Sequence, residues 1–274
     1  MEHAVYQQFY ELERDHWWFR GMRTICRSQL ARASQLNGRG RLRCLDIGCG
    51  TGLWTSELES LGTVWGLDVA PEALQHCRAR GLRRLIRGLA ERLPIADDSC
   101  DVVTALGVLE HVDDDAGLID ELARVCRPGG HVLLLTSAYR GLWSAHDEAV
   151  HHKRRYTRAE LLRLLSRSEF EIVKLSYVNA LLLPAIVGFR LAQRLFQRRC
   201  VERPSRSPDV FRVPGPLNHL LYACLWAESR WLRQANLPWG VGVLAVVRRT
   251  HEAGRRIEVG REDDACTTPQ LIVR

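Results

Sequence analysis

Two carboxylates and three glycines, placed at the ends of two apolar segments, are the residues of this chain best suited to binding a ligand. Asp46 precedes Gly48, Gly50 and Gly52 in the stretch CLDIGCGTG, and Asp68 ends the next apolar segment. Glycines between a strand and a helix let backbone approach a ligand closely, and an acid about 20 residues further on can hold ribose hydroxyls. These residues predict a nucleoside site.

The glycine spacing separates several nucleotide classes. A dinucleotide site requires G-x-G-x-x-G, whereas this turn reads G-x-G-x-G and position 53 is Leu. No Gly-Lys-Ser/Thr follows, as a triphosphate-binding loop would require. A carboxylate at Asp46 would repel phosphates but attract a cationic amino-acid group. An NAD-dependent oxidoreductase is therefore disfavoured, and a nucleoside that carries an amino acid is favoured.

Strands that alternate with helices are expected to position these residues. We expect seven strands, at 41–48, 63–69, 83–88, 99–109, 131–138, 170–178 and 240–249. Helices are expected over 1–36, 51–62, 71–81, 116–126 and 157–168, with Thr157 as a cap and 127–130 as a turn. This order predicts an α/β fold with a Rossmann-like, doubly wound and mainly parallel sheet.

Five sequence blocks together resemble the class I S-adenosylmethionine (SAM)-dependent methyltransferases. The blocks are LDIGCGTG, GLDVAPEAL, RGLAERLPIADDSCDVV, LGVLEHVDD and RVCRPGGHVLLLT, in this order over about residues 43–136. The resemblance implies the seven-stranded fold of that class, SAM as cofactor and S-adenosylhomocysteine as product. It also implies five segments: an N-terminal helical lid (1–36), a SAM-binding core (37–178), a helical insertion (179–239), a last strand (240–249) and a loose tail (250–274).

The resemblance implies roles for individual cofactor-binding residues. The methionine end of SAM should meet Asp46 and the glycine turn, the ribose Asp68, and the adenine Val69, Ala90, Glu91 and the backbone of Leu106. One position departs from the family pattern, because many relatives carry Asp where this chain has Leu89. The adenine amino group would thereby lose a side-chain acceptor.

The N-terminal segment HWWFRGMR (16–23) resembles a lid helix of part of this superfamily. Trp17 and Trp18 would then cover the sulfonium, since a cation is attracted to an aromatic face. Arg20 or Arg23 would meet the SAM carboxylate. The alternative is a docking helix whose tryptophans belong to the core.

The segment LWSAHDEAVHHKRRYT (142–157) resembles an HD…HxRRYT element of a bacterial subgroup of these enzymes. Histidine suits proton removal at neutral pH, so the candidate bases are His111, His146 and His152, of which His146 is preferred. The residues expected to contact the acceptor are Asp147, Arg154, Arg155 and Tyr156. An ion pair of Asp147 with Arg154 or Arg155 that only fixes the loop is the alternative. The histidines lack a clean metal-ligand spacing, so no metal is expected.

The insertion carries most of the charge excess. The chain has a net charge of +7, and residues 181–240 hold nine Arg against three acids. Arg190, Arg194 and Arg198 recur every fourth residue, with Val187, Leu191 and Leu195 on another face. This pattern suits a membrane surface or an anionic amphiphile, or else a cap helix with solvated arginines. A second apolar segment, LYACLWAESRWLRQANLPWG, indicates core or homodimer contact.

The chain start, MEHAVYQQFYELERDHWW, does not resemble a signal peptide, so a cytoplasmic location is expected. No nucleic-acid motif is present. We therefore expect a SAM-dependent methyltransferase that acts on oxygen or nitrogen, less readily carbon, of a small or amphiphilic molecule, anionic ones included. The alternative is a non-catalytic SAM-fold binding or assembly subunit.

Overall fold

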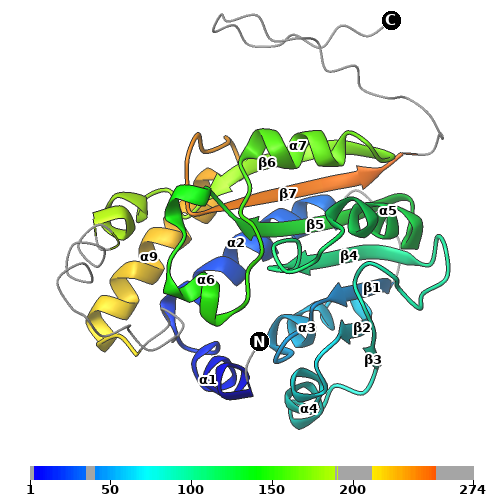
Figure 1. The fold of residues 1–274 in the computed structure, drawn as a ribbon, viewed down its shortest axis with the longest axis horizontal. Helices are drawn as coiled ribbons and strands as arrows, with labels where there is room; N and C mark the ends of the chain where they lie inside the picture. Colours follow the sequence, from blue (N-terminus) through cyan, green and yellow to red (C-terminus); the bar gives the residue numbers. More distant parts are fainter. Residues whose placement is uncertain (1–2, 35–40, 189, 191–211, 251–274) are drawn as a thin grey trace, which may run out of the picture.

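A seven-stranded sheet, in the order β3-β2-β1-β4-β5-β7-β6, forms the centre of this computed structural model (Figure 1). The structure describes residues 3–34, 41–188, 190 and 212–250. The strands are β1 (Leu42–Ile47), β2 (Gly62–Asp68), β3 (Leu85–Arg87), β4 (Cys100–Leu106), β5 (Cys126–Ser137), β6 (Phe170–Val178) and β7 (Gly242–Arg249). The first five are parallel, and β7 runs antiparallel between β5 and β6.

Helices cover both faces of the sheet. They are α1 (His3–Leu12), α2 (Trp17–Ser34), α3 (Leu53–Leu58), α4 (Pro71–Ala79), α5 (Asp115–Val125), α6 (Ala145–Ala149), α7 (Arg158–Leu165) and α9 (Gly215–Trp231), with a 3-10 turn at Arg140–Leu142. One apolar cluster joins the sheet to α5 and α7, and a second joins it to α2, α3 and α9. Strand residues alternate between the two clusters, as a sheet buried on both sides requires.

Local sequence signals explain where several elements begin. Thr157 caps α7 and forms a capping box with Glu160, as expected from the sequence. Asp114 caps α5 by accepting a hydrogen bond from the Gly117 amide at 2.8 Å, and Pro71 occupies the first turn of α4. Each cap satisfies or avoids an amide that would otherwise have no partner inside the helix.

The start of β5 differs from the expectation. Residues 127–130 were predicted as a turn, yet β5 begins at Cys126 and includes them. The pairing of β4 with β5 is irregular between Cys100 and Val102, and Gly129 adopts a φ of 75°. The prediction of a separate turn was wrong because the glycines form a bulge inside a continuous strand.

The described part of the insertion is dominated by α9, which packs along α2. Leu191, Arg194, Leu195 and Arg198, and the tail beyond residue 250, lie outside the described residues. Within the described ranges, no helix is long and apolar enough to cross a membrane.

The strand order reverses between β1 and β4, which are neighbours in the sheet although β2 and β3 separate them in sequence. In open α/β sheets, ligands bind at the carboxyl ends of the strands on either side of such a reversal. The glycine turn follows β1 directly, and the LGVLEHV segment begins at the end of β4. The topology therefore brings both predicted segments to one edge.

Candidate active site

The turn after β1 contains three glycines, and two of them are required for packing. Gly48 and Gly52 have φ angles of 66° and 86°. A Cβ atom on Gly48 would lie 2.5 Å from Cγ2 of Val108, and one on Gly52 would lie 2.8 Å from Sγ of Cys77. Around Gly50 (φ 54°), the nearest atom to an added Cβ is 3.9 Å away. Gly48 and Gly52 are needed for packing, and Gly50 leaves open space at the turn.

Asp68 holds the glycine turn against the end of β2. Its Oδ2 accepts a hydrogen bond from the Gly50 amide at 2.9 Å, and its Oδ1 accepts one from the Ala70 amide at 2.9 Å. Burial raises the pKa of Asp68 above its ordinary value, against these hydrogen bonds. A carboxylate has about four acceptor sites, so both oxygens retain capacity for ribose hydroxyls.

Asp46 is buried more completely and is held by two hydroxyls. Thr55 of α3 donates to Oδ2 at 2.6 Å, and Thr104 of β4 donates to Oδ1 at 2.7 Å. Burial raises the pKa of Asp46 to about 6, which leaves the group mainly ionised at pH 7. Asp46 therefore ties β1, α3 and β4 together, and its negative charge lies directly below the glycine turn.

Two exposed apolar side chains flank Asp68 on adjacent strand ends. Val69 follows β2 and is 55% exposed, and Leu89 lies just beyond β3 and is 57% exposed. Ala90 and Glu91 are half-buried beside them, and Glu91 accepts a hydrogen bond from the Asp113 amide at 3.3 Å. Leu89 thus supplies apolar surface at the position where an acid had been expected.

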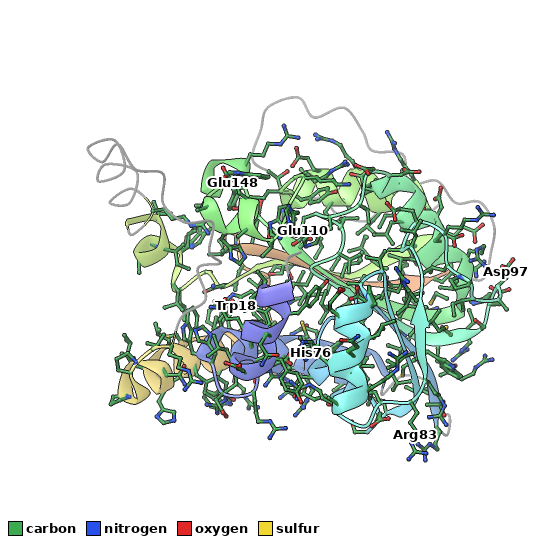
Figure 2. All side chains as sticks on the ribbon, turned by 60° about the horizontal axis from the view of Figure 1, so that its bottom comes forward. Trp18, His76, Arg83, Asp97, Glu110 and Glu148 are labelled. Carbon is green, nitrogen blue, oxygen red and sulfur yellow. The ribbon has the colours of Figure 1, made fainter. Side chains whose placement is uncertain are left out.

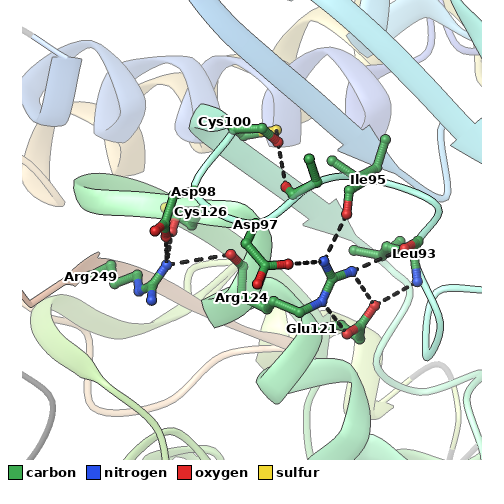
Figure 3. A network of polar contacts seen from close by, with 11 residues as sticks. Leu93, Ile95, Asp97, Asp98, Cys100, Glu121, Arg124, Cys126 and Arg249 are labelled. Carbon is green, nitrogen blue, oxygen red and sulfur yellow. Dashed lines mark hydrogen bonds and ion pairs between the residues drawn. The ribbon is translucent and has the colours of Figure 1, made fainter.

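A polar network fixes the loop that carries Ala90 and Glu91 (Figure 3). Arg124 of α5 donates to the carbonyls of Leu93 and Ile95 at 3.0 and 2.7 Å. Its partner Glu121 accepts from the Leu93 amide at 2.6 Å. A loop that is fixed through its backbone in this way can hold the flat face of a ligand ring beside the Val69 side chain.

The first helix, α1, lies beside α4 at the same edge of the sheet (Figure 2). Glu13, just beyond α1, accepts hydrogen bonds from Thr51 of the glycine turn and from Arg80 at the end of α4. Arg80 also donates to the Thr51 carbonyl at 2.8 Å. Tyr10 stacks on His76 of α4 with ring centroids 4.7 Å apart. Helix α1 is therefore anchored to two elements of the predicted cofactor site.

Tyr6 of α1 lies near Asp68, the carboxylate that is predicted to bind the ribose. Burial, followed by the negative charges of Asp68 and Glu72, raises the pKa of Tyr6. The sequence analysis did not single out Tyr6, Glu13 or Arg80. No signal in the sequence connects Glu13 to Arg80, because their contact depends on how α1 folds back on α4.

Contacts of the HWWFRGMR segment match the docking-helix alternative. Trp17 and Trp18 are half-buried against the second apolar cluster. Arg20 lies over the ring of Tyr222 in α9 at 4.1 Å, and Arg23 pairs with Glu57 at 2.9 Å. Contact of Trp18 and Arg20 with the cofactor remains a prediction.

The three predicted histidines meet at the carboxyl ends of β4 and β5. His152 lies 4.7 Å from His111 and 5.9 Å from His146 between ring centroids. Its Nδ1 is 2.7 Å from Oδ1 of Asp147, and its Nε2 is 3.9 Å from Oε1 of Glu110. Burial lowers the pKa of His111 to about 4, so that ring is neutral at pH 7.

Glu110 is a site residue that the sequence analysis overlooked. It is buried and accepts hydrogen bonds from the Thr136 and Ser137 hydroxyls at 2.7 and 3.0 Å. Its place beside His111 in the LGVLEHV segment could have identified it. Leu106, whose backbone is expected to meet the adenine, ends β4 and is half-buried against the second cluster.

The residues expected to contact the acceptor are engaged with the protein itself. Arg155 donates to both oxygens of Asp147, at 2.7 and 2.9 Å, and both side chains are buried. Burial alone would raise the pKa of Asp147, but hydrogen bonds from His152 and Arg155 lower it below its ordinary value. Arg154 pairs with Asp115 at 2.9 Å, and the Tyr156 hydroxyl donates to the same carboxylate. These contacts favour the structural alternative, with Arg155 rather than Arg154 as the partner of Asp147.

The residues present fit a SAM-sized nucleoside. Asp68 has acceptor capacity for ribose, Val69 and Leu89 offer apolar surface for adenine, and Gly50 leaves room at the turn. Asp46 supplies negative charge near the end where a cationic amino-acid group would lie. Among the described residues, no group of three or more His, Cys, Asp or Glu is arranged to hold a metal ion.

Comparison with known proteins agrees with this geometry. Residues 45–134 match the family described as "Methyltransferase domain". The chain is 33% identical over 165 residues to a "Probable S-adenosylmethionine-dependent methyltransferase" of Mycolicibacterium smegmatis, covering 59% of this chain and 62% of that protein. It is 36% identical over 102 residues to the "Ubiquinone biosynthesis O-methyltransferase" of Xanthomonas oryzae pv. oryzae, covering 34% and 42%. The chain thus spans less than two thirds of the length of either relative.

Solved structures share the fold. The S-adenosylmethionine-dependent methyltransferase of Mesorhizobium loti superposes with a TM-score of 0.52 at 19% identity, covering 81% of this chain and 98% of that one. At this identity the likeness concerns the fold alone. The matched family and its relatives imply SAM as the cofactor. Residues 45–134 therefore match a methyltransferase domain, and the seven-stranded sheet that holds them has the fold of solved SAM-dependent methyltransferases.

Proposed function

We propose that this chain transfers the methyl group of SAM to an oxygen or nitrogen atom of a small or amphiphilic molecule. The observation that carries the proposal is the hydrogen bond between Asp68 and Gly50 at the β1/β4 reversal. It joins the carboxylate that is predicted to bind the ribose to the glycine turn, which supports this proposal. The name of the Xanthomonas relative supports oxygen as the acceptor atom.

SAM, when bound, would supply an electrophilic methyl group. Asp68, Val69, Leu89 and the backbone of the glycine turn would hold and orient it, and α1 would exclude water from the ribose side. Much of the rate of such a displacement comes from positioning the two reactants. The chain must also remove a proton from an acceptor hydroxyl or ammonium group.

His152 is the histidine best placed to take that proton. Asp147 lies 2.7 Å from Nδ1, so this nitrogen would carry the ring proton and Nε2 would be the basic atom. Nε2 faces Glu110, whose carboxylate would stabilise the imidazolium after proton transfer. His111 and His146 would line the same position and shape it, rather than act as the base.

Calorimetric titration tests the cofactor assignment. We expect the full chain to bind SAM and S-adenosylhomocysteine with micromolar affinity and to give no heat with NAD. Asp68→Ala should raise the SAM dissociation constant about tenfold or more, because that corresponds to about 1.4 kcal/mol of lost ribose contacts. Asp120→Ala, on the exposed side of α5, is the matched control and should bind as the wild type does.

Two results would contradict the assignment. NAD binding without SAM binding would exclude a SAM-dependent methyltransferase, and unchanged SAM affinity in Asp68→Ala would show that Asp68 does not bind the ribose.

Methyl-labelled SAM with a panel of phenols, catechols and primary amines then tests methyl transfer. His152→Gln should reduce the rate about 100-fold with unchanged SAM affinity. Tight SAM binding without transfer to any acceptor would favour the non-catalytic subunit.

A further inference from the structure

Helix α9 and the segments beside it expose an unusual amount of apolar surface. Six large apolar side chains there are between 45% and 62% exposed, namely Leu181, Leu217, Leu220, Trp226, Trp231 and Trp239. We call this set the α9 flank. By helical spacing, Leu217, Leu220 and Trp231 lie on one face of α9. Large exposed apolar patches on soluble monomeric proteins mark contact with a partner or a membrane.

The opposite side of α9 is fully engaged with the rest of the protein. Leu225 and Leu232 are buried in the cluster that α9 shares with α2. Asn218 accepts a hydrogen bond from the Trp17 amide at 2.8 Å. Because α2 occupies that side, the exposed leucines and tryptophans of α9 face away from the core.

Two further contacts place Leu181 and Trp239 beside α9. The buried carboxylate of Glu228 accepts hydrogen bonds from the amides of residues 179–181, which joins Leu181 to the end of α9. The Leu237 amide donates to the Ser176 hydroxyl of β6 at 2.8 Å, so the chain leading to Trp239 runs along that strand. Figure 1 shows α9 at the outer side of the molecule, with one end of the helix beside the end of β6.

The exposed charged side chains on this part of the chain are all positive. Between residues 212 and 239, Arg212, Arg230 and Arg233 are exposed, whereas the single acid, Glu228, is buried. Exposed tryptophan and leucine combined with arginine are typical of surfaces that lie at a membrane interface. A second copy packed on the same flank would bring the arginines of the two copies together, which disfavours that occupant.

We propose that the α9 flank docks on an anionic lipid surface. The tryptophans and leucines would enter the headgroup region, and Arg212 and Arg230 would meet the lipid phosphates. The end of β6 lies at the same sheet edge as the ends of β4 and β5, since β6 runs parallel to β5. Docking would thus bring the acceptor side of the site toward the membrane, where an amphiphilic acceptor resides. The inference goes beyond the proposed methyl transfer and does not require it.

Co-sedimentation of the full chain with vesicles tests this inference. Wild type should partition onto phosphatidylcholine vesicles that contain phosphatidylglycerol, and much less onto phosphatidylcholine alone. Leu220→Ser combined with Trp231→Ser should lower the partition coefficient more than tenfold. Arg212→Gln and Arg230→Gln should each lower it about fivefold, on the phosphatidylglycerol vesicles only. Val173→Ser, at a 44% exposed apolar site on β6 outside the flank, should change nothing.

Circular dichroism and SAM titration on each variant establish that it is folded. Equal binding to both vesicle types, or an equal loss in Val173→Ser, would overturn the inference. So would a dimer that forms without lipid and disappears in the Leu220/Trp231 variant, because the occupant would then be a second copy. Vesicle binding without SAM binding would leave this inference standing and remove the proposed function.

Discussion

Asp147 shows how burial changes the consequence of losing an ion pair. Its carboxylate is fully buried, and Arg155 and His152 satisfy it from two directions. Asp113 pairs with Lys153 at 2.6 Å, but both of those side chains are open to solvent. Removing one partner of a buried pair leaves an uncompensated charge in a medium of low polarity, whereas water replaces a lost partner at the surface.

Asp147→Asn should therefore lower the free energy of unfolding by about 3–5 kcal/mol. Asp113→Asn, the exposed counterpart, should leave it unchanged within the error of a urea titration. Equal effects of the two substitutions would show that the Asp147–Arg155 pair does not support the loop around α6. The same Asp147 variant should alter the His152 ring tautomer, which nitrogen-15 NMR of the imidazole reports.

Asp46 makes the stability of the fold depend on pH. Burial raises its pKa to about 6 in the folded state, from an ordinary value of 3.8. The folded protein binds this proton more tightly than the unfolded chain, so the contribution is fully present below pH 3.8 and is lost as pH rises through 6.

Relative to wild type, Asp46→Asn should gain roughly 2.4 kcal/mol of unfolding free energy between pH 4 and pH 7, since each pKa unit corresponds to about 1.4 kcal/mol and part of the contribution is already lost at pH 4. Chemical denaturation at several pH values measures this difference. A difference that stays constant with pH would show that Asp46 titrates normally in the folded protein.

At the scale of elements, α1 is held to the cofactor edge by few contacts. Arg80 connects Tyr10, Glu13 and the glycine turn, and it lies 4.2 Å above the Tyr10 ring. Tyr6 of α1 lies close enough to Asp68 for the carboxylate charge to help raise the tyrosine pKa, so we expect α1 to limit the exchange of a ligand bound there. The rate of exchange should therefore depend on Arg80.

Arg80→Met should raise the SAM dissociation rate about tenfold, because Glu13 would lose its charged partner and release α1. Stopped-flow displacement of SAM by S-adenosylhomocysteine gives that rate. Arg78→Met is the matched control, since Arg78 lies exposed on the same helix. Equal rates in the two variants would contradict the role of α1 as a cover.

At the scale of the whole molecule, one carboxylate joins the insertion to the sheet. Glu228 of α9 accepts hydrogen bonds from the backbone amides that follow β6. At the other end of α9, Asn218 accepts a hydrogen bond from the Trp17 amide of α2. The insertion, the N-terminal helices and the last strands should therefore unfold together.

Glu228→Ala would leave three amides without an acceptor, two of them buried, so we expect a loss of about 3 kcal/mol. His219→Ala, exposed on the same helix, should have no effect. Urea unfolding followed by circular dichroism tests both variants. A separate early transition in the wild type would show that α9 is not coupled to the sheet.

Local patterns in the sequence were sufficient for the order of the elements and for the cofactor edge. Residues close together in the chain set the conformation of the glycine turn, the position of Asp68 and the ends of the strands. Over such short stretches, steric limits on the backbone angles leave few arrangements. The cap at Thr157 is equally local and was predicted correctly, and the structure adds its capping box with Glu160. The basic helix expected around Arg194 and the roles of single cofactor-binding residues stay predictions.

Only the tertiary structure decided which side chains meet across long separations. Arg155, rather than Arg154, faces Asp147, because two consecutive residues point in different directions and the sequence does not say which one turns inward. Glu13 reaches Arg80, and Leu89 joins Val69 at the sheet edge, only once α1 and the parallel strands have packed. Sequence thus determined the kind of site through short-range geometry, and packing of distant segments determined the neighbours that set its charge and access.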